Sequence, residues 1–122
     1  ICVCRGKSTE GIDFPDHHCR AVIIIGVPYP NIMDPTLIER KEHFSRIAHE
    51  AKTDNLIPPL SYGQWEFNSI IRSVNQALGR VIRHVNDYGM LFLLDERYAG
   101  KRFSGGMPKW AKNSVNIWSV WN

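Results

Sequence analysis

The sequence predicts an α/β fold with a mainly parallel sheet and flanking helices. Two continuous apolar runs, RAVIIIGV at 20–27 and MLFLLD at 90–95, have the composition of strands buried on both faces. Two helical patterns separate these runs along the chain. Because crossover helices join the parallel strands of layered α/β folds, we expect 21–26 and 90–94 to be inner strands of a parallel sheet.

Two further strands are predicted at the ends of the chain. ICVC at 1–4 alternates like the end of a strand, and VNIWSVW at 115–121 alternates more loosely, like a less buried one. The chain begins inside the first alternation without a methionine. We therefore expect a fragment of a longer protein.

The first helix is predicted to run from Asp34 to about Lys52. Asp34 is a favoured N-cap residue, and Pro35 suits the first helical position. Apolar residues then recur at helical spacing until the LIPPL stretch at 56–60, whose prolines end the helix.

The second helix is predicted over 62–84, with Ser61 and Gln64 as a capping-box pair at its start. Gly79 would lie in its interior, at a cost of about 1 kcal/mol relative to alanine. That cost indicates close approach by a ligand or by another backbone.

One face of this second helix is predicted to be basic. On a helical wheel Arg72, Arg80 and Arg83 lie within about 40° of Gln76, opposite an apolar stripe. A solvated basic face is the simpler interpretation, but the stripe lacks the acids that usually accompany one. Arginine at these positions suits bidentate binding of phosphate.

Composition places the 122 residues in a single globular domain at most. Hydrophobic residues make up 43% and charged residues 22%, and the net charge of +3 permits an anionic partner. No apolar run approaches the length of a membrane span, and no signal peptide is visible. We therefore predict no membrane partner.

The cysteines do not indicate a metal site. Three cysteines, an odd and low number, favour a reducing compartment over a disulfide scaffold. Their spacing with His17 and His18 matches no common zinc module, so we interpret Cys2, Cys4 and Cys19 as core residues.

Three loops are predicted at the carboxyl ends of the strands, where open α/β sheets bind ligands: RGKSTEG, PYPN and DERYAGKR. The GKST in the first loop mimics a phosphate-binding P-loop. The outer glycine of that motif would fall at position 1, which is Ile1, so the P-loop interpretation fails.

Two of these stretches resemble helicase motifs. RGKSTEGIDF is similar to helicase motif V, and QALGRVIRH is similar to motif VI. Together with CRAVIIIGVPYPN, LLDERYAGKR and MPKWAKNSV, they resemble the iron–sulfur XPD/Rad3 type of superfamily 2 DNA helicases. Within that type the resemblance is to the branch of the Fanconi anaemia group J, telomere elongation regulator and Chl1-type helicases.

The resemblance implies that residues 1–122 are the second RecA-like domain, the helicase C-terminal domain with motifs V and VI, and it leaves open a truncation at the N-terminus. It implies roles for two sets of residues. The DNA-binding residues would be Arg5, Gly6, Lys7, Ser8 and Thr9, and the ATP-binding residues would be Glu10, Gly11, Asp13, Gln76, Arg80 and Arg83.

Three of the ATP-binding residues have a catalytic role in the resemblance: Gln76, Arg80 and Arg83. The arginines would bind the γ-phosphate, one as an arginine finger, and Gln76 would position the attacking water. Asp13 has a second interpretation as a helix cap. Arg97 is a further candidate, although an ion pair with Asp95 or Glu96 explains it equally well.

The resemblance also implies partners. ATP and Mg²⁺ would be bound mainly by an absent first RecA-like domain, and the iron–sulfur cluster would lie elsewhere in the full-length protein. The whole would be a nuclear ATP-dependent 5′–3′ helicase acting on single-stranded DNA and DNA junctions, and the fragment alone would be inactive.

Two alternatives have no ATPase role. A nucleic-acid-binding module would use basic loops, with Trp65, Tyr98, Trp110 and Trp118 stacking on bases. The second alternative is a protein-interaction module.

Overall fold

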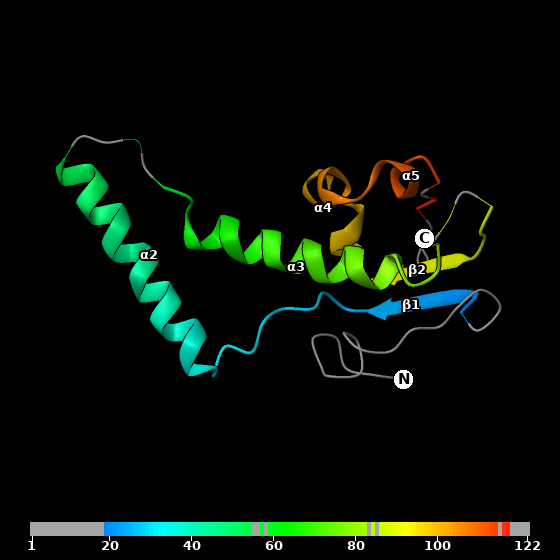
Figure 1. Cartoon of the computed structure of the whole chain (residues 1–122), viewed down its shortest axis with the longest axis horizontal. Helices are drawn as coiled ribbons and strands as arrows, with labels where there is room; N and C mark the ends of the chain where they lie inside the picture. The colour runs from blue at the N-terminus through cyan, green and yellow to red at the C-terminus, as the bar shows by residue number, and fades with distance from the viewer. Residues whose placement is uncertain are drawn as a thin grey trace. The chain divides into compact units, whose positions relative to one another are not determined.

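The computed structural model describes residues 19–54, 57, 59–82, 84, 86–114 and 116–117. Figure 1 shows the elements along the chain. They are β1 (Ala21–Ile25), α2 (Pro35–Thr53), α3 (Tyr62–Leu78), β2 (Met90–Leu94), the 3₁₀-helix η2 (Glu96–Ala99), α4 (Lys101–Gly106) and α5 (Lys109–Lys112).

The chain divides into two compact units, which are described separately. One unit combines the residues up to Val27 with those from Ile71 onward, and the other runs from Pro28 to Ile70. None of the described helices combines the length and the apolarity needed to cross a membrane.

The two strands pair in parallel, as the sequence predicts. Ala21 lies opposite Met90, and the register continues to Ile25 opposite Leu94. The α/β class with parallel pairing is therefore confirmed (Figure 1).

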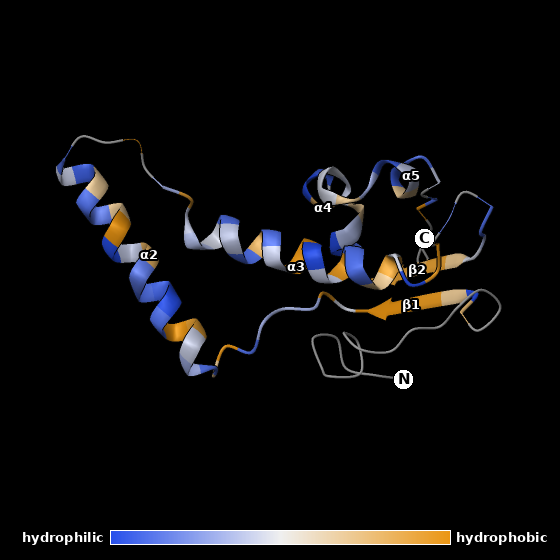
Figure 2. Ribbon diagram, in the orientation of Figure 1, coloured by the Kyte–Doolittle hydropathy of each residue, from blue (hydrophilic) through white to orange (hydrophobic). Residues whose placement is uncertain are grey.

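The predicted burial of both sheet faces is wrong for this chain. Ile24 is only 3% exposed, whereas its neighbours Ile23 and Ile25 are 58% and 81% exposed. On β2, Phe92 and Leu94 are exposed in the same way. Among the described residues each strand has one hydrogen-bonded neighbour, so neither is an inner strand there. Figure 2 shows how apolar both strands are.

The helices of the second unit begin where the capping rules predict. Asp34 Oδ1 accepts hydrogen bonds from the Thr36 N–H at 2.9 Å and from the Thr36 hydroxyl at 2.7 Å. The first of these two bonds caps α2. At the start of α3, the Ser61 N–H donates to Gln64 Oε1 at 2.9 Å and the Gln64 N–H donates to Ser61 Oγ at 3.3 Å, which completes the predicted capping box.

The core of the first unit forms around the C-terminal half of α3. The most buried aliphatic side chains there are Val74, Leu78 and Val81, each no more than 1% exposed. A Cβ on Gly106 would approach Ile71 side-chain atoms at 2.8–2.9 Å, so α4 packs closely on α3. Four buried residues from the C-terminal part of the chain complete this core: Tyr98, Phe103, Met107 and Ala111.

Candidate functional site

The carboxyl edge of the sheet joins the ends of both strands. Gly26 follows β1 with a φ of 73°, a conformation that favours glycine, and its N–H donates to the Leu94 carbonyl at 3.1 Å. The Tyr98 hydroxyl donates to the Gly26 carbonyl at 2.9 Å. The turn after β1 is therefore bonded to the DERYAGKR loop after β2, which is one of the predicted ligand loops. The PYPN loop begins the other unit.

The DERYAGKR loop contains a bidentate ion pair. Arg97 donates from Nε to Asp95 Oδ1 at 2.7 Å and from Nη2 to Asp95 Oδ2 at 2.6 Å. Hydrogen bonds from the Arg97 side chain and backbone N–H lower the pKa of Asp95 to about 2. The ion-pair interpretation of Arg97 is confirmed, and the pair fixes its guanidinium against the first turn of η2.

The C-terminus of α3 differs from the prediction. The helix ends at Leu78 rather than near residue 84. Its last backbone bond of α-helical type runs from the Gly79 N–H to the Asn75 carbonyl. The Arg80 and Val81 N–H groups then bond three residues back, which tightens the chain into a turn.

This ending corrects two earlier inferences. Gly79 lies past the end of the helix rather than in its interior, and a Cβ there would meet only ordinary contacts at 3.4 and 3.7 Å. Gly79 therefore gives no sign of a close ligand. The predicted column of three arginines also fails, because Arg80 lies in the turn and is not on the helix.

Three of the polar residues predicted for this site lie on α3 or just after its end: Arg72, Gln76 and Arg80. Arg72 and Gln76 are exposed and one helical turn apart on α3, opposite buried Val74 and Leu78. Arg80 follows in the turn, half-buried, beside Val81, which is 1% exposed and fixes the turn to the core. The burial of Leu78 and Val81 thus positions Gln76 and Arg80.

The other predicted site residues lie outside the described residues. They are Arg5, Gly6, Lys7, Ser8, Thr9, Glu10, Gly11, Asp13 and Arg83. The predicted strands at 1–4 and 115–121 also lie there, apart from Asn116 and Ile117, which are not in a strand.

The cysteine and aromatic predictions have mixed outcomes. Among the described residues no group of three metal-ligating side chains occurs, and Cys19 is a half-buried free thiol. Cys2, Cys4, His17, His18 and Trp118 lie outside those residues. Tyr98 is buried, only 6% exposed, which contradicts its proposed role in base stacking.

An aromatic cluster lies in the second unit. Phe44, Tyr62 and Trp65 have ring centroids 5.8–6.3 Å apart, and the Arg40 guanidinium lies 4.6 Å from the Trp65 ring. Burial, and then a hydrogen bond to Glu66, raise the pKa of Tyr62. Trp65 is thus engaged within its own unit.

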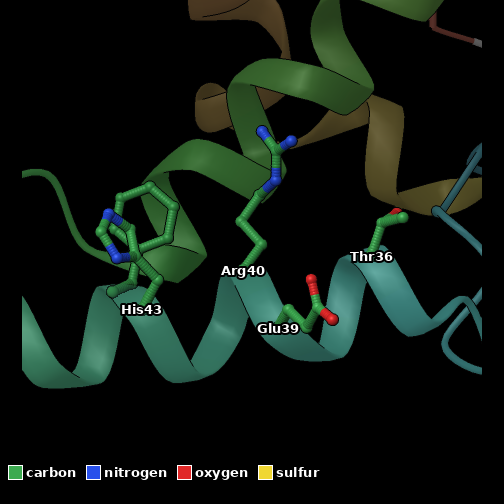
Figure 3. Close-up of a pocket in the computed structure, with 5 residues that line it drawn as sticks. Thr36, Glu39, Arg40 and His43 are labelled. Carbon is green, nitrogen blue, oxygen red and sulfur yellow. The ribbon is translucent and has the colours of Figure 1, made fainter.

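An open groove runs along α2 beside this cluster. Its volume is about 410 Å³, and it is lined by Thr36, Glu39, Arg40, His43 and Phe44. Figure 3 shows Arg40 and His43 extending from α2 on the same side, while Glu39 lies close to the helix. None of the predicted site residues lines this groove.

Sequence reasoning missed Asn75. Its Nδ2 donates to the Gly106 carbonyl at 3.1 Å, and its buried Oδ1 has no hydrogen-bond partner. A polar residue inside the apolar stripe SIIRSVNQAL was the available signal, because a half-buried amide needs partners. Asn75 ties α3 to the end of α4.

Comparisons with known proteins give the following matches. Residues 1–114 match the sequence model of the family described as "Helicase C-terminal domain". The regulator of telomere elongation helicase 1 homolog of Caenorhabditis briggsae is 42% identical over 95% of this chain and 11% of its own length.

The regulator of telomere elongation helicase 1 of Rattus norvegicus is 38% identical over 97% of this chain and 9% of its own. The Homo sapiens protein of the same name is 38% identical over 97% of this chain and 10% of its own. The chain therefore spans about a tenth of the length of the curated relatives it matches.

Proposed function

The chain belongs to the helicase C-terminal domain family, with similarity to XPD/Rad3-type helicases, and on that premise we propose that it is part of an ATP-dependent 5′–3′ DNA helicase. It is the second motor domain in this proposal. In this proposal it completes the ATP site of a first RecA-like domain. The relatives are about ten times longer than this chain, which is long enough to include such a domain.

The single observation that carries the proposal is the family match over residues 1–114, which includes Gln76 on the last turn of α3 and Arg80 in the turn that follows. Buried Leu78 and Val81 fix this end of the helix, where Gln76 is exposed. An arginine positioned by a fixed turn suits stabilisation of the charge that develops on a transferring phosphoryl group. Arg83 follows three residues later and serves the same γ-phosphate in this proposal.

Each remaining role follows from the chemistry of its side chain. Gln76 orients the attacking water through its amide. Residues 5–9 contact the DNA backbone through hydroxyl, backbone N–H and cationic groups. Glu10, Gly11 and Asp13 contact the nucleotide or hold the arginines of motif VI. ATP binding closes the two domains, hydrolysis releases them, and the cycle moves single-stranded DNA.

Metal cofactors belong to the rest of the protein in this proposal. Among the described residues Cys19 is the one cysteine, and no three ligating side chains come together, so these residues do not fit an iron–sulfur cluster or a Mg²⁺ site. We assign Mg²⁺ to the first domain and the cluster to other sequence. DNA repair in the nucleus is the setting that we propose.

ATP hydrolysis tests the proposal. The 122-residue chain alone should show no measurable turnover, and the whole protein should show turnover that single-stranded DNA stimulates. Hydrolysis by the isolated chain would overturn the division of the site between two domains.

The alternative is a nucleic-acid-binding or protein-interaction module without an ATPase role. Nanomolar binding of single-stranded DNA by the isolated chain would favour the nucleic-acid module, because a motor half should bind in the range of about 1 μM or weaker, as non-specific binders do.

A further inference from the structure

The positive charge of the chain is concentrated at its C-terminal end. Residues 97–122 contain five of the 15 basic residues and none of the 12 acidic ones, so the remaining chain carries ten basic and twelve acidic residues. The net charge of +3 is therefore the sum of +5 on residues 97–122 and −2 on the rest of the chain. Such asymmetry within one chain indicates an anionic partner for the basic segment.

The fold directs this charge outward. Phe103, Met107 and Ala111 recur every four residues and are each 5–8% exposed, so they face the core. The exposed residues of α4 and α5 include four cations and a tryptophan, which we term the basic patch: Lys101, Arg102, Lys109, Trp110 and Lys112. Figure 2 shows the hydrophilic stretches on both helices.

The two short helices are held together at this surface. Lys112 Nζ donates to the Gly105 carbonyl at 2.8 Å, a bond that joins α5 to the end of α4. Met107, which directly follows α4, is buried. The patch is therefore a fixed surface of the folded unit.

Among the described residues of this unit, acids do little to neutralise the lysines of the patch. Three acids of this unit are described, and two of them are paired with arginines outside the patch. Asp87 bonds Arg20, and Asp95 bonds Arg97. Glu96 is the third, against the three lysines of the patch.

Trp110 lies among these cations and is 42% exposed. Lys109 precedes it directly, and Lys112 follows two residues later. Leaving a large aromatic surface in water forgoes the free energy of burying it. A flat exposed ring among cations is the combination that binds single strands, since the cations meet phosphates and the ring stacks on a base.

We propose that the basic patch binds the backbone of single-stranded DNA, with Trp110 stacked on an unpaired base. This inference rests on the proposed function and adds a second DNA contact, separate in sequence from residues 5–9. Charge complementarity selects the polyanion, and the exposed ring selects a single strand over a duplex, whose bases are already stacked.

The test is a fluorescence titration of the 122-residue chain with an oligo(dT) of about 20 nucleotides, repeated over a salt series. The patch variant carries Lys101→Gln, Arg102→Gln and Lys109→Gln, and it keeps Lys112, whose bond to Gly105 joins the two helices. The matched control removes three cations from α2 through Lys41→Gln, Arg46→Gln and Lys52→Gln, all exposed. Circular dichroism establishes that each variant retains its helices.

The patch variant should bind about tenfold or more weakly at low salt, and its salt slope should fall by about 2, the loss expected for three single-strand phosphate contacts. The control should lose markedly less on both measures. Equal losses in the two variants would overturn the proposal, because net charge alone would then explain the binding.

The stacking part has its own variant. Trp110→Ala should weaken oligo(dT) binding about tenfold at every salt concentration and leave the salt slope unchanged, while Trp110→Phe retains most of the affinity. Duplex DNA of the same length should bind more weakly than oligo(dT). Equal binding of duplex, or no effect of Trp110→Ala, would contradict the single-strand assignment and leave a general polyanion surface.

Failure here is distinguishable from failure of the proposed function. The patch is measured by binding to the isolated chain, and the ATPase role is measured by turnover of the whole protein. A patch variant that binds normally, together with arginine variants that lose turnover, would remove this proposal and leave the helicase assignment intact.

Discussion

The Tyr98 hydroxyl donates a hydrogen bond to the Gly26 carbonyl across the carboxyl edge of the sheet, at 2.9 Å. The two residues are 72 positions apart in the chain. Tyr98 is buried, and its ring packs edge-on against Phe103 with centroids 5.2 Å apart. This bond joins the turn after β1 to the loop after β2, at the edge where ligands of α/β sheets bind.

Tyr98→Phe should lower the free energy of unfolding by about 1 kcal/mol, because the carbonyl loses its donor while the ring stays packed. Chemical denaturation measures the change. Tyr88→Phe is the matched control, since the Tyr88 side chain is 70% exposed and its ring keeps the Arg20 guanidinium at 4.3 Å. Equal effects of the two substitutions would show that the Gly26 bond contributes nothing.

Gly89→Ala should destabilise the first unit by about 2 kcal/mol or more. A Cβ there would lie 2.0 Å from Val81 Cγ1 and 3.0 Å from the Arg20 carbonyl oxygen, and Val81 is too buried to move aside. Gly79→Ala should be close to neutral, because its Cβ meets ordinary contacts. Thermal unfolding of both variants compares the two positions. A large loss of stability in Gly79→Ala would indicate that another group approaches this position closely after all.

The Asp95–Arg97 ion pair makes stability depend on pH. The pKa of Asp95 is about 2 in the folded chain and about 3.9 when unfolded, so its stabilisation is complete above about pH 5 and is lost as the pH falls from about 4 to 2. Asp95→Asn should therefore be less stable than the parent at pH 6 and nearly equal to it at pH 2. The free energy of unfolding at the two pH values measures this.

Arg97→Ala is the partner variant, in which Asp95 loses its side-chain donor. Its loss of stability relative to the parent should therefore also be present at pH 6 and nearly absent at pH 2. A difference between parent and Asp95→Asn that is the same at pH 6 and pH 2 would contradict the assignment of this pKa.

Local rules predicted the helix starts well. Asp34 and the Ser61–Gln64 pair act on N–H groups two or three residues away, so sequence alone determines them. The helix end at Leu78 was not predictable from periodicity. Val81 stays buried after the helix has become a turn, so the apolar pattern continues through the change of structure.

Burial of the sheet faces depends on more than strand composition. The β-branched run at β1 predicted burial on both sides, yet burial requires a covering layer, which composition does not specify. The Tyr98–Gly26 bond and the Asn75–Gly106 bond join distant parts of the chain, and no spacing rule reveals them. The Asp95–Arg97 pair, two residues apart, was within reach of sequence reasoning.

The role of the arginines in motif VI is the central claim, and the measurement that tests it most directly is the ATP turnover, kcat, of the whole protein carrying Arg83→Ala or Arg80→Ala. Each should lose roughly 10³-fold or more of turnover while ATP binding stays largely intact, because in the proposed function a first domain holds most of the nucleotide. Arg72→Ala, an exposed arginine on α3 before the turn, should have a smaller effect. Near-normal turnover in both Arg80→Ala and Arg83→Ala would contradict the account and return this region to a solvated basic surface.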